Sequence, residues 1–123
     1  MSVEQRTSEV PVRRYPRMAA EYSVSFRRSL PNGAQSEPHT SRTRTLGLGG
    51  LMFETGIQID RGESLLVEIA LGDHTIVATG TVVYTELREG LWQIGVQFTA
   101  LAEDDRDALL GIYLQREYRL TPE

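Results

Sequence analysis

Three arginines within five residues, Arg13, Arg14 and Arg17, give the sequence its clearest chemistry. An arginine side chain presents a planar fork of N–H donors that pairs bidentately with phosphate oxygens, or with O6 and N7 of guanine. Pro16 removes a backbone donor and favours extended geometry at Tyr15, so this segment is not predicted to be helical. The arginines are suited to gripping a compact anionic ligand. The alternative is a solvated basic stretch beside a polar tail.

A second candidate is the glycine cluster Gly47, Gly49 and Gly50, which follows Thr45. Glycine lacks side-chain bulk and tolerates positive φ, so backbone amides beside it can approach a ligand. No Gly-Lys-Ser/Thr sequence follows, which excludes a P-loop. The alternative interpretation is a tight turn or a bulge between two strands.

Catalytic and metal-binding arrangements are hard to build from this composition. The chain has no cysteine, and its two histidines, His39 and His74, are expected in a surface loop and at a turn. A thiolate nucleophile and a histidine-based metal cluster are therefore not expected. Asp104 and Asp105 are adjacent carboxylates, but acidic residues there are typical of a helix N-terminus. The sequence predicts neither an enzyme nor a bound cofactor or metal.

Length and patterning predict one globular domain. The chain has 123 residues, of which 40% are hydrophobic and 24% charged, as in an ordinary folded domain. No apolar run is long enough for a membrane span, and the first ten residues lack the apolar segment of a signal peptide. We therefore expect a cytoplasmic protein without membrane insertion. Residues 1–11 are predicted to be a flexible tail and residues 12–120 a single domain.

The net charge of −4 is unevenly distributed. Residues 1–44 carry eight arginines against four acidic residues, a net charge of +4, whereas residues 45–123 carry five against thirteen, a net charge of −8. An anion is therefore expected to bind at the N-terminal third of the chain.

The elements that would position these residues are short strands followed by one helix. Trp92, Ile94 and Val96 alternate as in a half-buried strand. The run that begins at His74 also alternates, which places Tyr84 on the same face as Val82. The predicted strands cover residues 20–26, 42–46, 51–54, 64–71, 74–85 and 91–98, with a loop over 34–41 and a helix from 103 that ends before 121. This order favours a mainly β fold, a six-stranded antiparallel Greek-key β-barrel with a C-terminal α-helix.

The order of these motifs resembles the PilZ domain family over residues 12–118. In that family an RxxxR segment precedes the first barrel strand and a [DN]xSxxG segment lies at the end of a later strand. Strands of the form G-x-V-V-[WY] and I-G-V-x-F then lead to a C-terminal helix. The matching stretches are Arg13 to Arg17, Gly49 to Phe53 after the serine position, Gly80 to Tyr84, Ile94 to Phe98, and Glu103 to Arg106 at the helix start.

The resemblance implies a receptor for cyclic di-GMP, since PilZ domains are known as such receptors. Arg13 and Arg17 would clamp phosphates and guanine faces, with Arg14 assisting. Tyr84 would lie close to the ligand or pack at the core or rim. Ligand binding would order the arginine segment, and the altered surface would engage a separate effector protein. The implied binding residues are Arg13, Arg14, Arg17, Thr45, Gly47, Gly49, Gly50 and Tyr84.

The chain departs from the family in the middle motif. Thr45, Gly47 and Gly50 stand at the [DN], S and G positions, and only the last matches. Each lost hydrogen bond to a neutral partner costs about 0.5–1.5 kcal/mol, so two losses weaken binding roughly tenfold to a few hundredfold. Retained binding is favoured, because the arginine contacts are charge-assisted. The alternative is a ligand-independent adaptor that acts through protein contacts alone.

Arg42, Arg44 and the N-terminal arginines raise a third hypothesis, single-stranded nucleic-acid binding. Such binders combine a basic groove with several stacking aromatics. This chain is net acidic, and its five Tyr, three Phe and one Trp stand mostly at inward-looking strand positions. No DNA partner is therefore expected.

Overall fold

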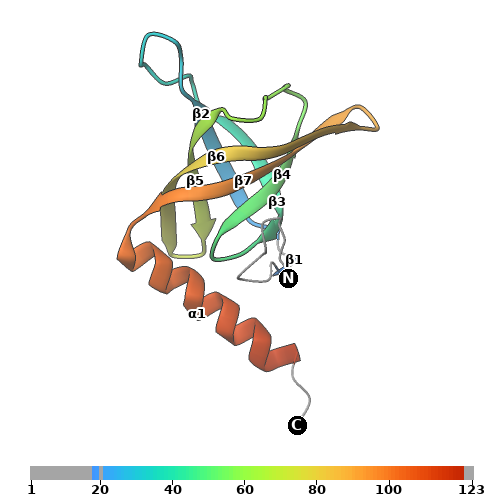
Figure 1. Cartoon of the computed structure of the whole chain (residues 1–123). Coiled ribbons are helices and arrows are strands. Elements are labelled where there is room, and N and C mark those ends of the chain that lie inside the picture. The colour runs from blue at the N-terminus through green and yellow to red at the C-terminus, as the bar shows by residue number, and fades with distance from the viewer. Residues whose placement is uncertain (1–17, 20, 121–123) are drawn as a thin grey trace, which may run out of the picture.

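A closed antiparallel barrel and one helix make up the computed structural model, which describes residues 18–19 and 21–120, except the side chains of 18, 19, 113 and 115–120 (Figure 1). The short strand β1 (Met18–Ala19) lies beside β3, and α1 (Glu103–Leu120) follows the barrel. The barrel strands are β2 (Ser23–Arg28), β3 (His39–Leu46), β4 (Gly50–Thr55), β5 (Ser64–Leu71), β6 (His74–Arg88) and β7 (Leu91–Leu101).

The strand order around the barrel is β2–β3–β4–β7–β6–β5, and β5 closes the ring by pairing with β2. Hairpins connect β5 to β6 and β6 to β7. Strand β4 pairs with β7, and residues 56–63 cross over from β4 to the start of β5. Three hairpin-connected strands with a fourth beside them form a Greek key. The predicted six-stranded barrel with a C-terminal helix is confirmed, and β1 is an additional two-residue strand.

Two interactions hold the crossover between β4 and β5 against the barrel, one apolar and one ionic. Ile59 is fully buried in the core. Arg28 donates two hydrogen bonds to Glu63, from Nε to Oε1 at 3.0 Å and from Nη2 to Oε2 at 2.8 Å. This bidentate pair joins the end of β2 to the residue before β5, so it fixes where the crossover re-enters the barrel.

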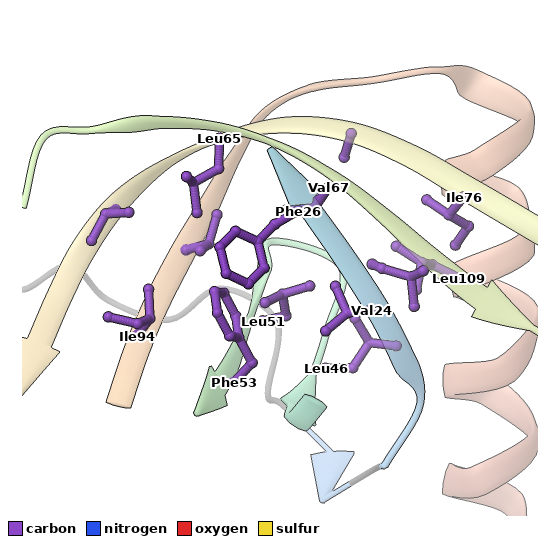
Figure 2. Close-up of a cluster of buried hydrophobic side chains, with 14 of the residues drawn as sticks. Val24, Phe26, Leu46, Leu51, Phe53, Leu65, Val67, Ile76, Ile94 and Leu109 are labelled. Atoms are coloured by element: carbon purple, nitrogen blue, oxygen red, sulfur yellow. The ribbon is translucent and has the colours of Figure 1, made fainter. Parts of the chain in front are cut away.

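The core lies inside the barrel and includes Leu109 of α1 (Figure 2). The rings of Phe26 and Phe53 stack at a centroid distance of 4.7 Å. Leu109 of α1 is 1% exposed and lies beside Ile76 at one end of the barrel (Figure 2). Burying a leucine of this size stabilises the fold by about 1.5–3 kcal/mol, so the start of the helix is an integral part of the domain.

Three strands are longer than the sequence pattern predicts. The predicted loop over 34–41 is wrong at its end, because β3 begins at His39, where Phe26 is its partner on β2. His39 is consequently half-buried, with its ring 5.3 Å from that of Phe26, rather than in a surface loop. Strands β6 and β7 continue to Arg88 and Leu101. Cross-strand pairing extends each of these strands by three residues, into polar sequence on β3, Glu86-Leu87-Arg88 on β6 and Thr99-Ala100-Leu101 on β7.

The N-terminus of α1 is tied to β6 by Asp105. Its Oδ1 lies 2.8 Å from Nε2 of His74, and its Oδ2 accepts a hydrogen bond of 3.2 Å from the Val77 amide. The hydrogen bond from His74, and then that from Val77, hold the pKa of the Asp105 carboxyl below its ordinary value. The predicted role of this acidic cluster as a helix start is confirmed.

Replacing Asp105 with asparagine is expected to destabilise the domain in a pH-dependent way. A carboxyl with a lowered folded-state pKa contributes stability above its unfolded-state pKa, and this contribution is lost as the pH falls through the folded-state value. The wild type should therefore exceed Asp105→Asn in stability at about pH 5, and the gap should shrink towards about pH 3, since the unfolded pKa is near 3.9. Urea unfolding at both pH values measures the gap. A gap that stays constant would contradict this role.

Candidate functional site

Two of the predicted site residues, Thr45 and Tyr84, lie at the ends of one cross-strand row. Thr45 pairs with Met52 on β4, Met52 with Gly95 on β7, and Gly95 with Tyr84 on β6. Leu46, Ile94 and Val96 face the core, so the row lies on the outer face of the barrel. Three strand spacings separate its ends by about 14 Å. We call Thr45, Met52, Gly95 and Tyr84 the outer row.

Tyr84 reaches this face because of a β-bulge. The register of β6 against β7 shifts between Val82 and Tyr84, which leaves Val83 as the extra residue. A bulge reverses the alternation of the residues that follow it. The prediction that Tyr84 shares the face of Val82 is therefore wrong: Val82 is buried, whereas Tyr84 is 38% exposed.

The Tyr84 side chain is held in place along β6. Its hydroxyl donates to Oε1 of Glu86, and the same oxygen accepts a hydrogen bond of 3.1 Å from Nη2 of Arg88. The hydrogen bond to Glu86 raises the pKa of the phenol. A Cβ on Gly95 would lie 3.0 Å from Cβ of Tyr84, so the lack of a side chain at residue 95 leaves room for the Tyr84 side chain.

The glycine cluster forms the turn between β3 and β4 at one end of the outer row. The Gly47 amide donates to the Gly50 carbonyl at 2.9 Å, and the Gly49 carbonyl accepts from the Phe98 amide at 2.8 Å. Neither Gly49 nor Gly50 has a positive φ. A Cβ on Gly50 would lie 2.0 Å from the Val96 carbonyl oxygen, whereas one on Gly49 would meet nothing within 4 Å. Gly50 is thus required by close backbone approach, and Gly49 borders open space.

Thr45 carries an unused polar group. Its Oγ1 is buried and makes no hydrogen bond in the part of the chain that the structure describes. Buried hydroxyls are normally satisfied by protein, water or a bound molecule. Thr45 also pairs with Ala19 of β1, and Met18 pairs with Leu46. The residue that follows Arg17 in the sequence is therefore anchored next to the glycine turn. Arg13, Arg14 and Arg17 themselves lie outside the described residues.

A polar row runs beside the outer row and was not anticipated from the sequence. Nη1 of Arg44 forms an ion pair of 2.8 Å with Oε2 of Glu54, and this oxygen also accepts a hydrogen bond of 3.1 Å from Gln93. Arg42 in turn donates to the Glu21 carbonyl at 3.0 Å. Both arginines are thus engaged with acidic residues or backbone, so the face is not the continuous basic groove that single-stranded nucleic-acid binders use.

A shallow groove of about 390 Å³ lies on the opposite wall, over β2, β3, β5 and β6. Five hydroxyl side chains line it together with Val24, Ala70 and the carboxylate of Glu68, and none of the predicted site residues that the structure describes is among them. No cluster of metal-ligating side chains occurs within the described ranges. No helix among the described residues is long and apolar enough to cross a membrane.

The family model of the PilZ domain matches residues 11–115. Among solved structures, B. subtilis MotI/DgrA, an inhibitor of motility, superimposes with a TM-score of 0.75 at 21% identity, over 92% of this chain and 55% of that one. The PilZ domain of E. coli YcgR with c-di-GMP has a TM-score of 0.65 at 19% identity, over 87% and 94% of the two chains.

The K. pneumonia MrkH–c-di-GMP complex has a TM-score of 0.67 at 19% identity, over 89% of this chain and 54% of that one. The chain thus spans about half the length of MotI/DgrA and MrkH, and nearly all of the YcgR domain. The comparison with curated proteins finds no match. The family model covers most of the sequence, and the barrel matches the neighbouring structures in fold, so this chain belongs to the PilZ domain family.

Proposed function

We propose that this PilZ domain is a cytoplasmic receptor that binds cyclic di-GMP on its outer row and signals to a separate effector protein. The observation that carries the proposal is the convergence of three features at one edge of the barrel. These are the orphaned Thr45 Oγ1, the open backbone at Gly49, and β1, which starts directly after the arginine segment. A hydrogen-bonding group, an accessible backbone and a source of cations are what a guanine nucleotide requires.

The outer row offers a surface of suitable size and polarity. The thioether of Met52 lies within the row and the exposed ring of Tyr84 lies at one end, so the row offers a purine base apolar and aromatic contacts over about 14 Å. The ligand is a nucleotide messenger rather than a substrate, since we assign no catalytic residue, and no resident cofactor is proposed.

Thr45 and Gly47 depart from the family pattern, and this departure favours a second candidate function, that of a ligand-independent adaptor. Calorimetric titration of the purified chain with cyclic di-GMP, with linear pGpG as the matched control, separates the two functions. Saturable binding of the cyclic form supports the receptor. A folded protein that gives no heat up to high ligand concentration would overturn it in favour of the adaptor.

Thr45→Val is expected to separate ligand binding from stability. Valine has nearly the shape of threonine, and the hydroxyl it removes has no described protein partner, so the stability should stay equal or rise. If the hydroxyl contacts the nucleotide, its loss weakens binding by about twofold to tenfold, corresponding to 0.5–1.5 kcal/mol. Thr45→Asn, which restores an amide at the motif position, should instead strengthen binding. Equal affinities in all three proteins would remove Thr45 from the site.

A further inference from the structure

The β6–β7 hairpin extends beyond the rest of the barrel (Figure 1). Pairing of β5 with β6 ends at Ser64 and Thr81, and pairing of β4 with β7 ends at Thr55 and Trp92. The hairpin itself continues to Arg88 and Leu91. On the side of β6 that faces away from β7, residues 83–88 therefore have no strand partner within the described part of the chain.

The backbone of this edge is ready to pair with another strand. Glu89 and Gly90, with φ of 54° and 85°, form a two-residue turn of the type that suits hairpins. The residues that flank such a turn direct their N–H and C=O groups at each other, and the direction then alternates along the strand. Thr85 and Leu87 thus present these groups to the open edge. An unpaired edge of this kind is a template for a strand from another chain.

The hairpin also concentrates exposed apolar side chains. Of the eight large hydrophobic residues exposed in the described chain, four belong to its projecting part, residues 83–91: Val83, Tyr84, Leu87 and Leu91. Leu87 is the most exposed of the eight, at 56%, and lies opposite Trp92. A cluster of this kind on a projecting element is typical of an interaction surface.

The side chains of the edge are complementary to themselves. When the segment Glu86-Leu87-Arg88 is placed antiparallel to a second copy, Leu87 meets Leu87 on the two-fold axis. Glu86 of each copy then faces Arg88 of the other. In this register Leu87 exchanges backbone hydrogen bonds across the axis, which agrees with the direction of its free N–H and C=O groups. Opposite charges directly across an antiparallel pair are stabilising, and like charges are destabilising.

We propose that a second copy of this chain adds its β6 edge antiparallel to the first, so that residues 86–88 of the two copies pair in a two-fold symmetric dimer with one continuous sheet. The contact involves few residues, so its buried area is that of a weak, transient association. The fraction of dimer therefore depends on protein concentration. This dimer does not depend on cyclic di-GMP and is compatible with either function considered above.

A charge-swap mixing experiment tests this register. Glu86→Arg places arginines at both charged positions, and Arg88→Glu places glutamates at both. Each variant alone then faces like charges across the axis, so its dimer dissociation constant should rise by roughly tenfold. In an equimolar mixture every cross-strand pair is attractive, although the pairs within each chain remain like-charged. Sedimentation equilibrium of the full chain should show that the mixture dimerises about as tightly as the wild type and that each separate variant dimerises about tenfold more weakly.

Three further proteins control for indirect effects, and circular dichroism verifies that each is folded. Leu87→Arg should abolish the dimer. Leu91→Ser, on the neighbouring strand, and Tyr84→Phe, which loses the contact with Glu86, should retain it. A wild type that is monomeric at all concentrations overturns the proposal. The partner of the β6 edge would then be a strand of a different protein. A dimer that survives both single charge changes and Leu87→Arg also overturns it.

Discussion

Replacing Arg13 and Arg17 together by alanine is expected to weaken cyclic di-GMP binding by about 100-fold or more while the barrel stays folded. Hydrogen bonds to charged groups contribute about 1.5–3 kcal/mol each, so two guanidinium contacts supply about 3–6 kcal/mol of binding free energy. Folding should be preserved, because the core among the described residues begins at Val24 and consists of strand residues, Leu48 and Ile59 of two connections, and Leu109 of α1. Calorimetry on both proteins, with thermal unfolding as the folding check, measures the effect.

A matched variant distinguishes local contacts from net charge. Arg61→Ala/Arg106→Ala removes the same two positive charges from exposed positions in the crossover and on α1. This variant should keep the affinity of the wild type within a factor of about three at physiological salt, where charges farther apart than about 8 Å are screened. Equal losses in both double variants would mean that the arginine segment acts only through its overall charge.

Gly50→Ala is expected to produce the largest loss of stability among single substitutions in the glycine turn. The added Cβ would lie 2.0 Å from the Val96 carbonyl oxygen and 3.2 Å from Cα of Gln97, both of which are backbone atoms of β7. Relief requires β4 and β7 to separate, which breaks their ladder at its first pair. Overpacking against backbone costs about 3 kcal/mol or more, corresponding to a fall in melting temperature of about 10 °C.

Gly49→Ala provides the control for this experiment. No atom lies within 4 Å of its added Cβ, and Gly49 has no positive φ, so stability should change by less than about 0.5 kcal/mol. Thermal unfolding of the two variants measures the contrast. Similar melting temperatures would contradict the close approach of β4 and β7 at Gly50. Because Gly49 borders open space beside the outer row, reduced nucleotide binding by folded Gly49→Ala would place the ligand over this turn.

The barrel could be predicted because most of its strands alternate cleanly. On β5 Leu65, Val67 and Ile69 are buried in alternation, and on β7 Ile94 and Val96 both face the core, as the sequence pattern indicates. The errors occur where pairing rather than side-chain pattern forms the strand. His39 to Ser41 are polar, yet they belong to β3 because β2 pairs with them. The extension of β6 to Arg88 likewise depends on its pairing with β7.

The candidate site was predicted as separate motifs but not as a surface. Thr45, Gly49, Gly50 and Tyr84 were identified from the family pattern, whereas Met52 and Gly95, which lie between Thr45 and Tyr84, were not identified as site residues. Their positions depend on register shifts between Thr43 and Thr45 and between Val82 and Tyr84. A bulge depends on how two strands pair, so neither strand's alternation reveals it. Close packing against the Val96 backbone, rather than a positive φ, explains the glycine at position 50.

The most direct test of the receptor function is a two-dimensional amide NMR titration of the ¹⁵N-labelled chain with cyclic di-GMP. The structure offers two surfaces on different walls, the outer row and the groove lined by Ser25, Thr40 and Glu68. Saturable shifts that centre on the amides of Thr45, Gly49 and Gly95 are the predicted result. Shifts confined to the groove, or a spectrum unchanged at saturating nucleotide, would contradict the proposal that cyclic di-GMP binds on the outer row.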